Sequence, residues 1–296
     1  MPEICVAHLV REKNGIGPFK RFMESYDSNR GGIEHDLLIV FKGFHGGTDL
    51  AEYDGLLKRF PHKRLFVKDF GFDIRPYFVA ARAFDYKYFC FLNSYSVIMD
   101  KEWLLKMYRH VSSEGVGIVG ATGSYQSMFN DYMRFFEAWK KIKSLKRYRG
   151  ILRRWFKQPY FYLVWQKRKL DFPSYPNYHI RTNAFMLPRD VMLRLRKSLI
   201  LRKFDAYRFE SGRNSLTRQV MRMGLGLLVV GRDGKGYEKE DWVKSGTHWM
   251  GGQANLLVAD NQAIKFWEGD EKYKLWLARH AWADKATPEA VCSFPS

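Results

Sequence analysis

The alternation of strand-like and helical segments in the first 120 residues constrains the fold of this chain most strongly. Short apolar runs that are typical of buried strands occur at residues 4–10, 37–41, 65–67, 88–92 and 115–120. Segments with apolar residues near helical spacing lie between them, most clearly at 74–84 and 101–110. This order predicts a mostly parallel sheet with helices on its faces. We therefore expect an open α/β fold.

The same pattern returns in the second half of the chain after an interruption. A strand-like segment at 179–187 and a strand at 225–230 flank two expected helices, one from residue 188 and one at 214–223. We interpret residues 1–235 as one catalytic domain that is interrupted by an insertion at 127–175. Residues 236–296 are then a C-terminal extension that packs on this domain.

The insertion has an amphipathic and basic composition. Aromatic and aliphatic residues recur with a helical period from Tyr132 to Trp155, and lysines and arginines fill the positions between them and continue to Lys169. Such a helix can lie on an anionic membrane, so residues 129–169 are a candidate membrane-binding segment. The same apolar stripe would also suit packing on the protein's own core or on a second subunit of a homo-oligomer.

The charge of the chain narrows the choice of partners. Fifty Lys and Arg against 31 Asp and Glu give a formal charge of +19, which favours nucleotide phosphates, acidic lipids or nucleic acid. A nucleic-acid-binding module is the weaker interpretation, because the basic residues concentrate in one insertion and no helix-turn-helix, RNP or zinc-finger pattern occurs. Three widely separated cysteines exclude a zinc ribbon and argue against a disulfide framework.

The sequence lacks the signals of export and membrane insertion. It has no uncharged apolar run of about 18 residues and no basic start followed by an apolar stretch. We therefore expect a cytoplasmic protein that is peripheral at the inner face of the membrane.

A series of short motifs follows the expected strands and helices. The motifs are FDIRPY at 72–77, FLNS at 91–94, GIVGATG at 117–123, RTNAFM at 181–186, FESG at 209–212 and LTRQ at 216–219. Their order resembles that of the GT-A glycosyltransferases, in particular the family 2-like enzymes of bacterial surface polysaccharide synthesis. The resemblance extends over roughly residues 4–232.

This resemblance implies transfer of a sugar from a nucleotide-diphosphate donor to a glycan or lipid-linked acceptor, in envelope polysaccharide or lipopolysaccharide synthesis. Such enzymes normally carry an Asp-x-Asp pair that holds Mn²⁺ or Mg²⁺, but Asn93 and Ser94 stand at this place. Because hard cations require carboxylates, we expect either no cofactor requirement or a divalent cation held at another site. The missing acidic pair also leaves open an inactive scaffold that binds nucleotide sugar or glycan.

Glu210 is the candidate catalytic base, because an inverting transfer needs a carboxylate near the acceptor hydroxyl. Alternatively, Glu210 caps the following helix or pairs with Arg208 or Arg213. Asp73 is a candidate ligand of the nucleotide base or ribose, since it follows a strand at the ligand edge of the sheet. It would equally suit a role as the N-cap of the next helix.

The other candidates would bind the donor or the acceptor. Asn93 and Ser94 are expected at the donor, although both residue types are also common in turns. Arg11, Arg181 and Arg213 are candidates to balance the diphosphate charge, Arg213 also at the acceptor side. Residues expected to touch sugar or acceptor are Thr122, Gly123 and Asn183. His248 is a weak candidate metal ligand and otherwise a structural or acceptor-binding residue.

Overall fold

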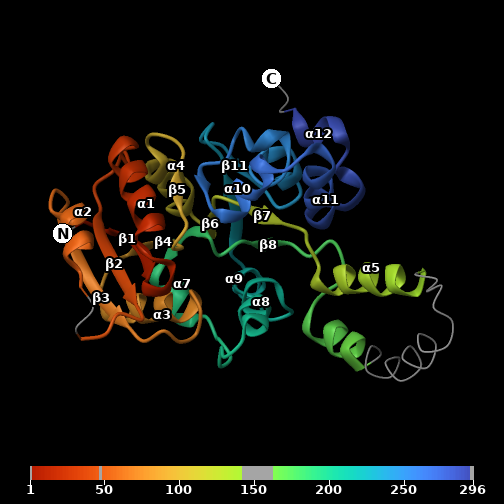
Figure 1. The fold of residues 1–296 in the computed structure, drawn as a ribbon, viewed down its shortest axis with the longest axis horizontal. Coiled ribbons are helices and arrows are strands. Elements are labelled where there is room, and N and C mark those ends of the chain that lie inside the picture. The colour runs from red at the N-terminus through yellow and green to blue at the C-terminus, as the bar shows by residue number, and fades with distance from the viewer. Residues whose placement is uncertain (1, 47–48, 142–162, 294–296) are drawn as a thin grey trace.

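An eight-stranded, mostly parallel sheet forms the centre of the molecule (Figure 1). The structure, a computed structural model, describes residues 2–46, 49–141 and 163–293. The strands lie in the order β11-β10-β6-β9-β4-β1-β2-β3. Their bounds are β1 (Ile4–Arg11), β2 (Asp36–Lys42), β3 (His62–Val67), β4 (Tyr88–Leu92), β6 (Val116–Gly120), β9 (Ala184–Pro188), β10 (Gly226–Val230) and β11 (Gly236–Tyr237).

The expected open α/β architecture is confirmed. β1 pairs in parallel with β2 and β4, β2 with β3, and β6 with β10. By contrast, β9 runs antiparallel between β4 and β6, and β11 runs antiparallel to β10. The sheet is therefore parallel at its N-terminal half and mixed where the second half of the chain joins it.

The strand-like segment 179–187 is two strands rather than one. β8 (His179–Ile180) pairs with β7 (Gly123–Ser124) in a separate sheet, and β9 begins only at Ala184. Between them, the backbone N–H of Thr182 donates to the Glu210 side chain at 3.1 Å. At this point the chain passes from the small sheet of β7 and β8 to the central sheet.

Helices cover both faces of the sheet. One face packs against α1 (Ile16–Ser28), α2 (Ala51–Leu57) and α4 (Trp103–Val111), and the other against α3 (Ile74–Ala83), α7 (Arg189–Arg194) and α9 (Leu216–Arg222). The side chains of β1 alternate between the two cores, as expected for a strand buried on both sides. Cys5, Ala7 and Leu9 belong to one core, and Ile4, Val6 and Val10 belong to the other.

The helix that carries Glu210 is among those that the sequence interpretation did not name. α8 (Lys203–Ser211) buries only Phe209 and Ser211, so it has no clear apolar stripe. The side chain of Asp205 holds its first turn by accepting from the backbone N–H groups of Leu201 and Arg202, at 3.1 and 2.9 Å. Glu210 therefore lies near the end of α8, and it also precedes α9, the helix expected at 214–223.

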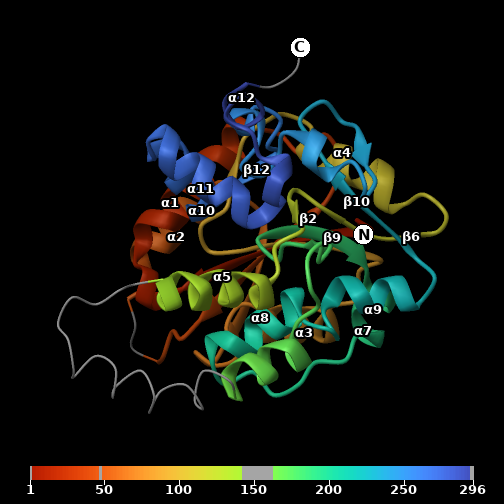
Figure 2. The same cartoon turned by 90° about the vertical axis from the view of Figure 1, so that its right-hand side faces the viewer.

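The insertion projects from the sheet as two helical pieces (Figure 2). These are α5 (Met128–Lys141) and the helical residues 163–171. The expected continuous helix and the candidate membrane segment 129–169 lie partly outside the described residues. Within the described ranges, no helix is long and apolar enough to cross a membrane.

Residues from 236 onward pack directly with the central sheet. They supply β11 and also β12 (Val258–Ala259), which pairs with β5 (Val97–Ile98). Three further helices follow, α10 (Asn261–Glu268), α11 (Glu271–Trp282) and α12 (Pro288–Cys292). The ring of Trp282 lies 4.8 Å from that of Tyr125, and both are buried. The boundary expected at 235 divides the β10–β11 hairpin.

Candidate active site

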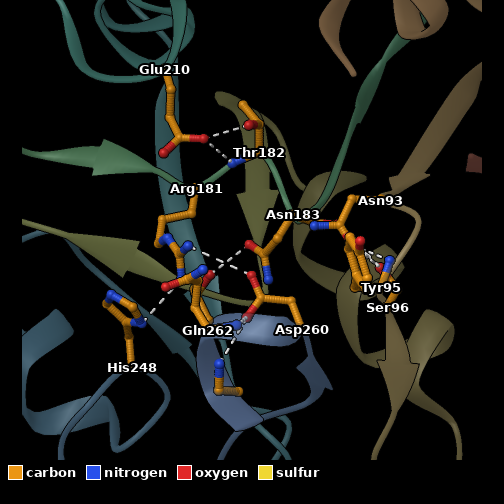
Figure 3. A network of polar contacts seen from close by, with 12 residues as sticks. Asn93, Tyr95, Ser96, Arg181, Thr182, Asn183, Glu210, His248, Asp260 and Gln262 are labelled. Atoms are coloured by element: carbon orange, nitrogen blue, oxygen red, sulfur yellow. Dashed lines mark hydrogen bonds and ion pairs between the residues drawn. The ribbon is translucent and has the colours of Figure 1, made fainter. Parts of the chain in front are cut away.

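A cleft of about 510 Å³ opens where several strands and α8 meet (Figure 3). Asn93 reaches it from the carboxyl end of β4, and Asp73 from the start of α3. Open α/β sheets bind ligands at this edge. Of the residues expected from the sequence, the cleft brings together Asp73, Asn93, Arg181, Asn183 and Glu210.

Glu210 is held by one of its two carboxylate oxygens. Its Oε2 accepts from the backbone N–H of Thr182 at 3.1 Å and also from the Thr182 hydroxyl. In the described part of the chain, Oε1 has no hydrogen-bond partner. The alternative roles for Glu210 do not occur, because Arg208 pairs with Asp171 and Ser215 caps the next helix. A carboxylate with one fixed and one open oxygen is oriented to accept a proton.

Arg181 lies opposite Glu210 and is surrounded by residues from the C-terminal extension. Its Nη2 is 3.6 Å from Oδ2 of Asp260, and its Nη1 is 3.3 Å from Nδ1 of His248. Burial, together with the Arg181 charge, holds the pKa of His248 well below its usual range. The neutral imidazole therefore accepts a hydrogen bond from the guanidinium, and Asp260 balances part of its charge.

Asp73 lies in a separate charged group at the ends of β1, β2 and β3. Burial raises its pKa, the charge of Glu210 adds to this, and Lys42 and Arg11 oppose it. The side chain makes no capping hydrogen bond to α3. Asp73 therefore stands at the N-cap position of α3 without capping it through its side chain, and its carboxylate lines the cleft.

Arg11 and Lys42 are arranged around a second carboxylate, Asp69. Arg11 donates to Asp69 through two parallel hydrogen bonds of 3.0 Å, and Nζ of Lys42 lies 3.5 Å from Oδ1 of the same residue. Lys42 also donates to the carbonyl of Phe72 at 2.7 Å. The two parallel bonds to Asp69 fix the Arg11 guanidinium, and Arg11 does not line the cleft itself.

Asn93 and Asn183 join the ends of β4 and β9. Oδ1 of Asn93 accepts from the backbone N–H of Tyr95 at 2.9 Å, so Asn93 forms the turn that its residue type suggested and also lines the cleft. Its backbone N–H donates to the Asn183 carbonyl at 2.9 Å. The Thr122 hydroxyl donates to Oδ1 of Asn183 at 2.8 Å, and this bond fixes the orientation of the Asn183 amide. Ser94 is buried behind this turn.

Arg11, Ser94, Thr122 and His248 do not line the cleft, and two further expected residues also lie away from it. A Cβ atom added to Gly123 would come within 2.5 Å of the Trp242 ring, so this glycine serves close packing. Arg213 donates to the carbonyl of Lys169 at 3.2 and 3.0 Å and lines a separate small cavity. Neither position brings its residue to Glu210.

The residues present do not fit a divalent cation. The described ranges contain no group of three His, Cys, Asp or Glu that could hold one. At the end of β4, Asn93 and Ser94 supply no carboxylate. Both oxygens of Asp260 are engaged, Oδ1 at the first turn of α10 and Oδ2 with Arg181. The fixed cation at this point of the cleft is the Arg181 guanidinium.

Sequence reasoning assigned no role to Thr182, and it offered Asp260 only as a residue that helps to close the site or lies in a solvated turn. Thr182 belongs to the RTNAFM motif, yet its part in holding Glu210 depends on α8, which the sequence did not reveal. Asp260 follows an apolar run, but its ion pair joins segments almost eighty residues apart. Only an apolar stripe in α8 could have indicated the contact between Thr182 and Glu210. No sequence pattern indicated the ion pair between Asp260 and Arg181.

No protein-family model and no curated protein sequence matches the chain. The fold is similar to a solved structure of the mannosyltransferase PcManGT from Pyrobaculum calidifontis in complex with GDP-Man and Mn²⁺. That similarity has 10% identity and a TM-score of 0.46, and it covers 80% of this chain and 57% of the other. A structure of S. aureus TarS, residues 1–349, matches with 14% identity and a TM-score of 0.33 over 40% of this chain and 35% of that one. The chain spans less than two thirds of the length of either of these two structures.

Proposed function

We propose that this protein is a glycosyltransferase that moves a sugar from a nucleotide-diphosphate donor to a hydroxyl of a glycan or lipid-linked acceptor. The observation that carries the proposal is that Glu210 and Arg181 line one cleft at the ligand edge of the sheet. A carboxylate that can accept a proton and a fixed cation that can receive developing negative charge are what this reaction requires.

In the proposed reaction, the acceptor oxygen attacks the anomeric carbon of the donor. The bond from that carbon to the diphosphate oxygen breaks, and the acceptor proton passes to the open oxygen of Glu210. The electron pair leaves with the diphosphate, which Arg181 stabilises together with Lys203 and Lys265 of the same cleft. General-base catalysis of this kind contributes about 10²- to 10⁴-fold to the rate.

We propose further that Asp73 binds the ribose or the base of the donor. It is a carboxylate with no capping bond and lies beside the cationic Lys42. Because the donor set around Arg181 does not fit a cation, the proposed transfer is independent of added metal.

The acceptor and the location are proposed from the sequence. The resemblance to surface-polysaccharide enzymes and the basic aromatic composition of residues 129–169 suit envelope polysaccharide or lipopolysaccharide synthesis at the inner face of the membrane.

Calorimetric titration with a panel of nucleoside diphosphates and nucleotide sugars, each in EDTA and again with Mn²⁺, tests donor binding. We expect one donor to bind equally in both conditions. Binding that requires Mn²⁺ would contradict the metal-independent mechanism, and no binding in either would contradict the function itself.

The variant Glu210→Gln tests the base. We expect it to keep donor affinity within about twofold and to lose transfer by at least about 100-fold. Glu268→Gln, at an exposed glutamate of α10, is the matched control and should leave both quantities unchanged. Unimpaired transfer by Glu210→Gln would remove Glu210 from this role, and donor binding without turnover in the wild-type protein would favour the scaffold interpretation.

A further inference from the structure

The connection between α7 and α8 exposes apolar side chains that a soluble surface normally hides. Leu199 and Leu201 are 66% and 60% exposed, whereas Ile200 between them is 3% exposed. In an extended segment, successive side chains point to opposite sides. Burial of Ile200 in the core therefore directs both leucines outward.

Hydrogen bonds fix this connection at both ends. At its start, the amide of Gln219 accepts from the backbone N–H of Arg196 at 2.7 Å and donates to the carbonyl of the same residue at 2.8 Å. At its end, Asp205 accepts from the backbone N–H groups of Leu201 and Arg202. The leucines are presented by a backbone that is held in place, not by a loose loop.

The exposed apolar surface continues onto a second segment. Leu170, in the helical residues 163–171, is 74% exposed, and it lines a small cavity together with Ile200 and Arg196. We call Leu170, Leu199 and Leu201 the leucine surface. Clusters of exposed apolar side chains of this kind mark binding surfaces.

Exposed cations flank the three leucines along the chain. They are Arg194, Arg196, Arg202, Lys203, Lys167 and Lys169. Between residues 191 and 204 the sequence contains no Asp or Glu, and the two flanking carboxylates are engaged, Asp190 with Arg194 at 3.2 Å and Asp205 with the backbone N–H groups of Leu201 and Arg202. An anionic partner is therefore favoured, whereas a symmetric contact with a second copy would bring like charges together.

We propose that the leucine surface docks on an anionic lipid bilayer, with Leu199 and Leu201 entering the boundary between headgroups and acyl chains. Each cation near such a surface contributes about 1 kcal/mol, and the leucines add apolar burial that free anions in solution would not provide. The leucine surface is formed by residues outside α5. The side chains of residues 135–162 are not described.

Docking at the leucine surface would place the proposed transfer reaction beside a membrane, and this role rests on the proposed function. α8 begins at the leucine surface and carries Glu210 near its other end. Lys203 and Tyr207 of the same helix line the cleft. A membrane at the leucine surface would therefore bring the sugar of a lipid-linked acceptor to the cleft.

Vesicle flotation tests the docking directly. Purified protein is mixed with phosphatidylcholine vesicles with and without phosphatidylglycerol, and the bound fraction is compared with that of the double variant Leu199→Ser/Leu201→Ser. We expect binding only with the acidic lipid, and a decrease in partition coefficient of about tenfold or more in the variant. Phe66→Ser is the matched control, because Phe66 is 52% exposed on β3, the edge strand of the central sheet, and lies outside both the leucine surface and residues 129–169.

A second measurement does not depend on loss of binding. Leu199→Cys, made in a Cys292→Ser background and labelled with a polarity-sensitive fluorophore, should shift to the blue when acidic vesicles are added. Cys5 and Cys90 are buried and should remain unlabelled in the folded protein.

Several outcomes would overturn the inference: no blue shift, no preference for acidic vesicles, or equal binding by the wild-type protein and the double variant. A wild-type dimer in sedimentation velocity that the double variant dissociates would assign the leucine surface to self-association. Calorimetric donor binding is measured in parallel. Donor binding without lipid binding refutes this inference alone, and lipid binding without any donor refutes the proposed function alone.

Discussion

His8 gives this protein an unusual dependence of stability on pH. The residue lies in the middle of β1 with a fully buried side chain, and its ring stacks on that of Phe22 at 3.6 Å. In the described part of the chain, neither ring nitrogen has a hydrogen-bond partner. Burial lowers the pKa of His8 from 6.5 to about 3. The folded state therefore contains a neutral imidazole that cannot take up a proton at moderately acidic pH.

The sign and size of the effect follow from this shift. As pH falls below 6.5, the unfolded chain binds a proton at this residue and the folded chain does not, so stability decreases until both states are protonated near pH 3. At pH 5 the folded state has lost about 2 kcal/mol through His8 relative to pH 8. This is a large part of the stability of an ordinary domain.

The variant His8→Leu removes this titration and also removes two buried polar atoms without partners. We expect it to be at least as stable as the wild type at pH 8, because unpaired buried polar groups cost about 1–3 kcal/mol each. Between pH 8 and pH 5 it should lose about 2 kcal/mol less than the wild type.

Urea denaturation of both proteins at pH 8, 7, 6 and 5 measures the effect. The buried His179 and His248 contribute equally to both proteins, so the difference between the two curves isolates His8. Parallel curves over this range would refute the reasoning, since they would mean that His8 is protonated in the folded state or reaches water.

Two further predictions concern the site and its support. Thr182→Val removes the hydroxyl that donates to Glu210, so turnover should fall about tenfold while donor affinity in calorimetry stays unchanged; an equal loss in both would assign Thr182 to donor binding. Gly123→Ala places a methyl group 2.5 Å from the Trp242 ring, so the free energy of unfolding in urea should fall by about 1–3 kcal/mol; an unchanged value would show that Trp242 moves aside freely.

The sequence predicted the part of the fold that periodic burial determines. Strands such as 88–92 and helices such as α3 have continuous or regularly spaced apolar residues, and both were found at their expected places. α8 was missed because most of its side chains face the cleft or solvent and follow no apolar period. The spacing of apolar residues therefore does not reveal a helix that is held by hydrogen bonds rather than by an apolar face.

The site was predictable where it follows strand ends and not where it depends on side-chain direction. Asn93 and Asn183 meet because their strands pair as neighbours. Arg213 lies only three residues after Glu210, yet the chain has left α8 by then and the side chain turns to Lys169. The partners of Arg181 could not be foreseen, since His248 and Asp260 reach it from segments with no sequence signal for that contact.

The contacts of Arg181 have a consequence for how the protein is made. A ribosome completes the central strands and Glu210 before it reaches His248 and Asp260, because synthesis proceeds from the N-terminus. Until those residues emerge and pack, the Arg181 guanidinium has neither its acceptor nor its counter-charge. A nascent chain can therefore form its sheet early, but it acquires an ordered cationic group in the cleft only after the segment that follows β11 has joined the sheet.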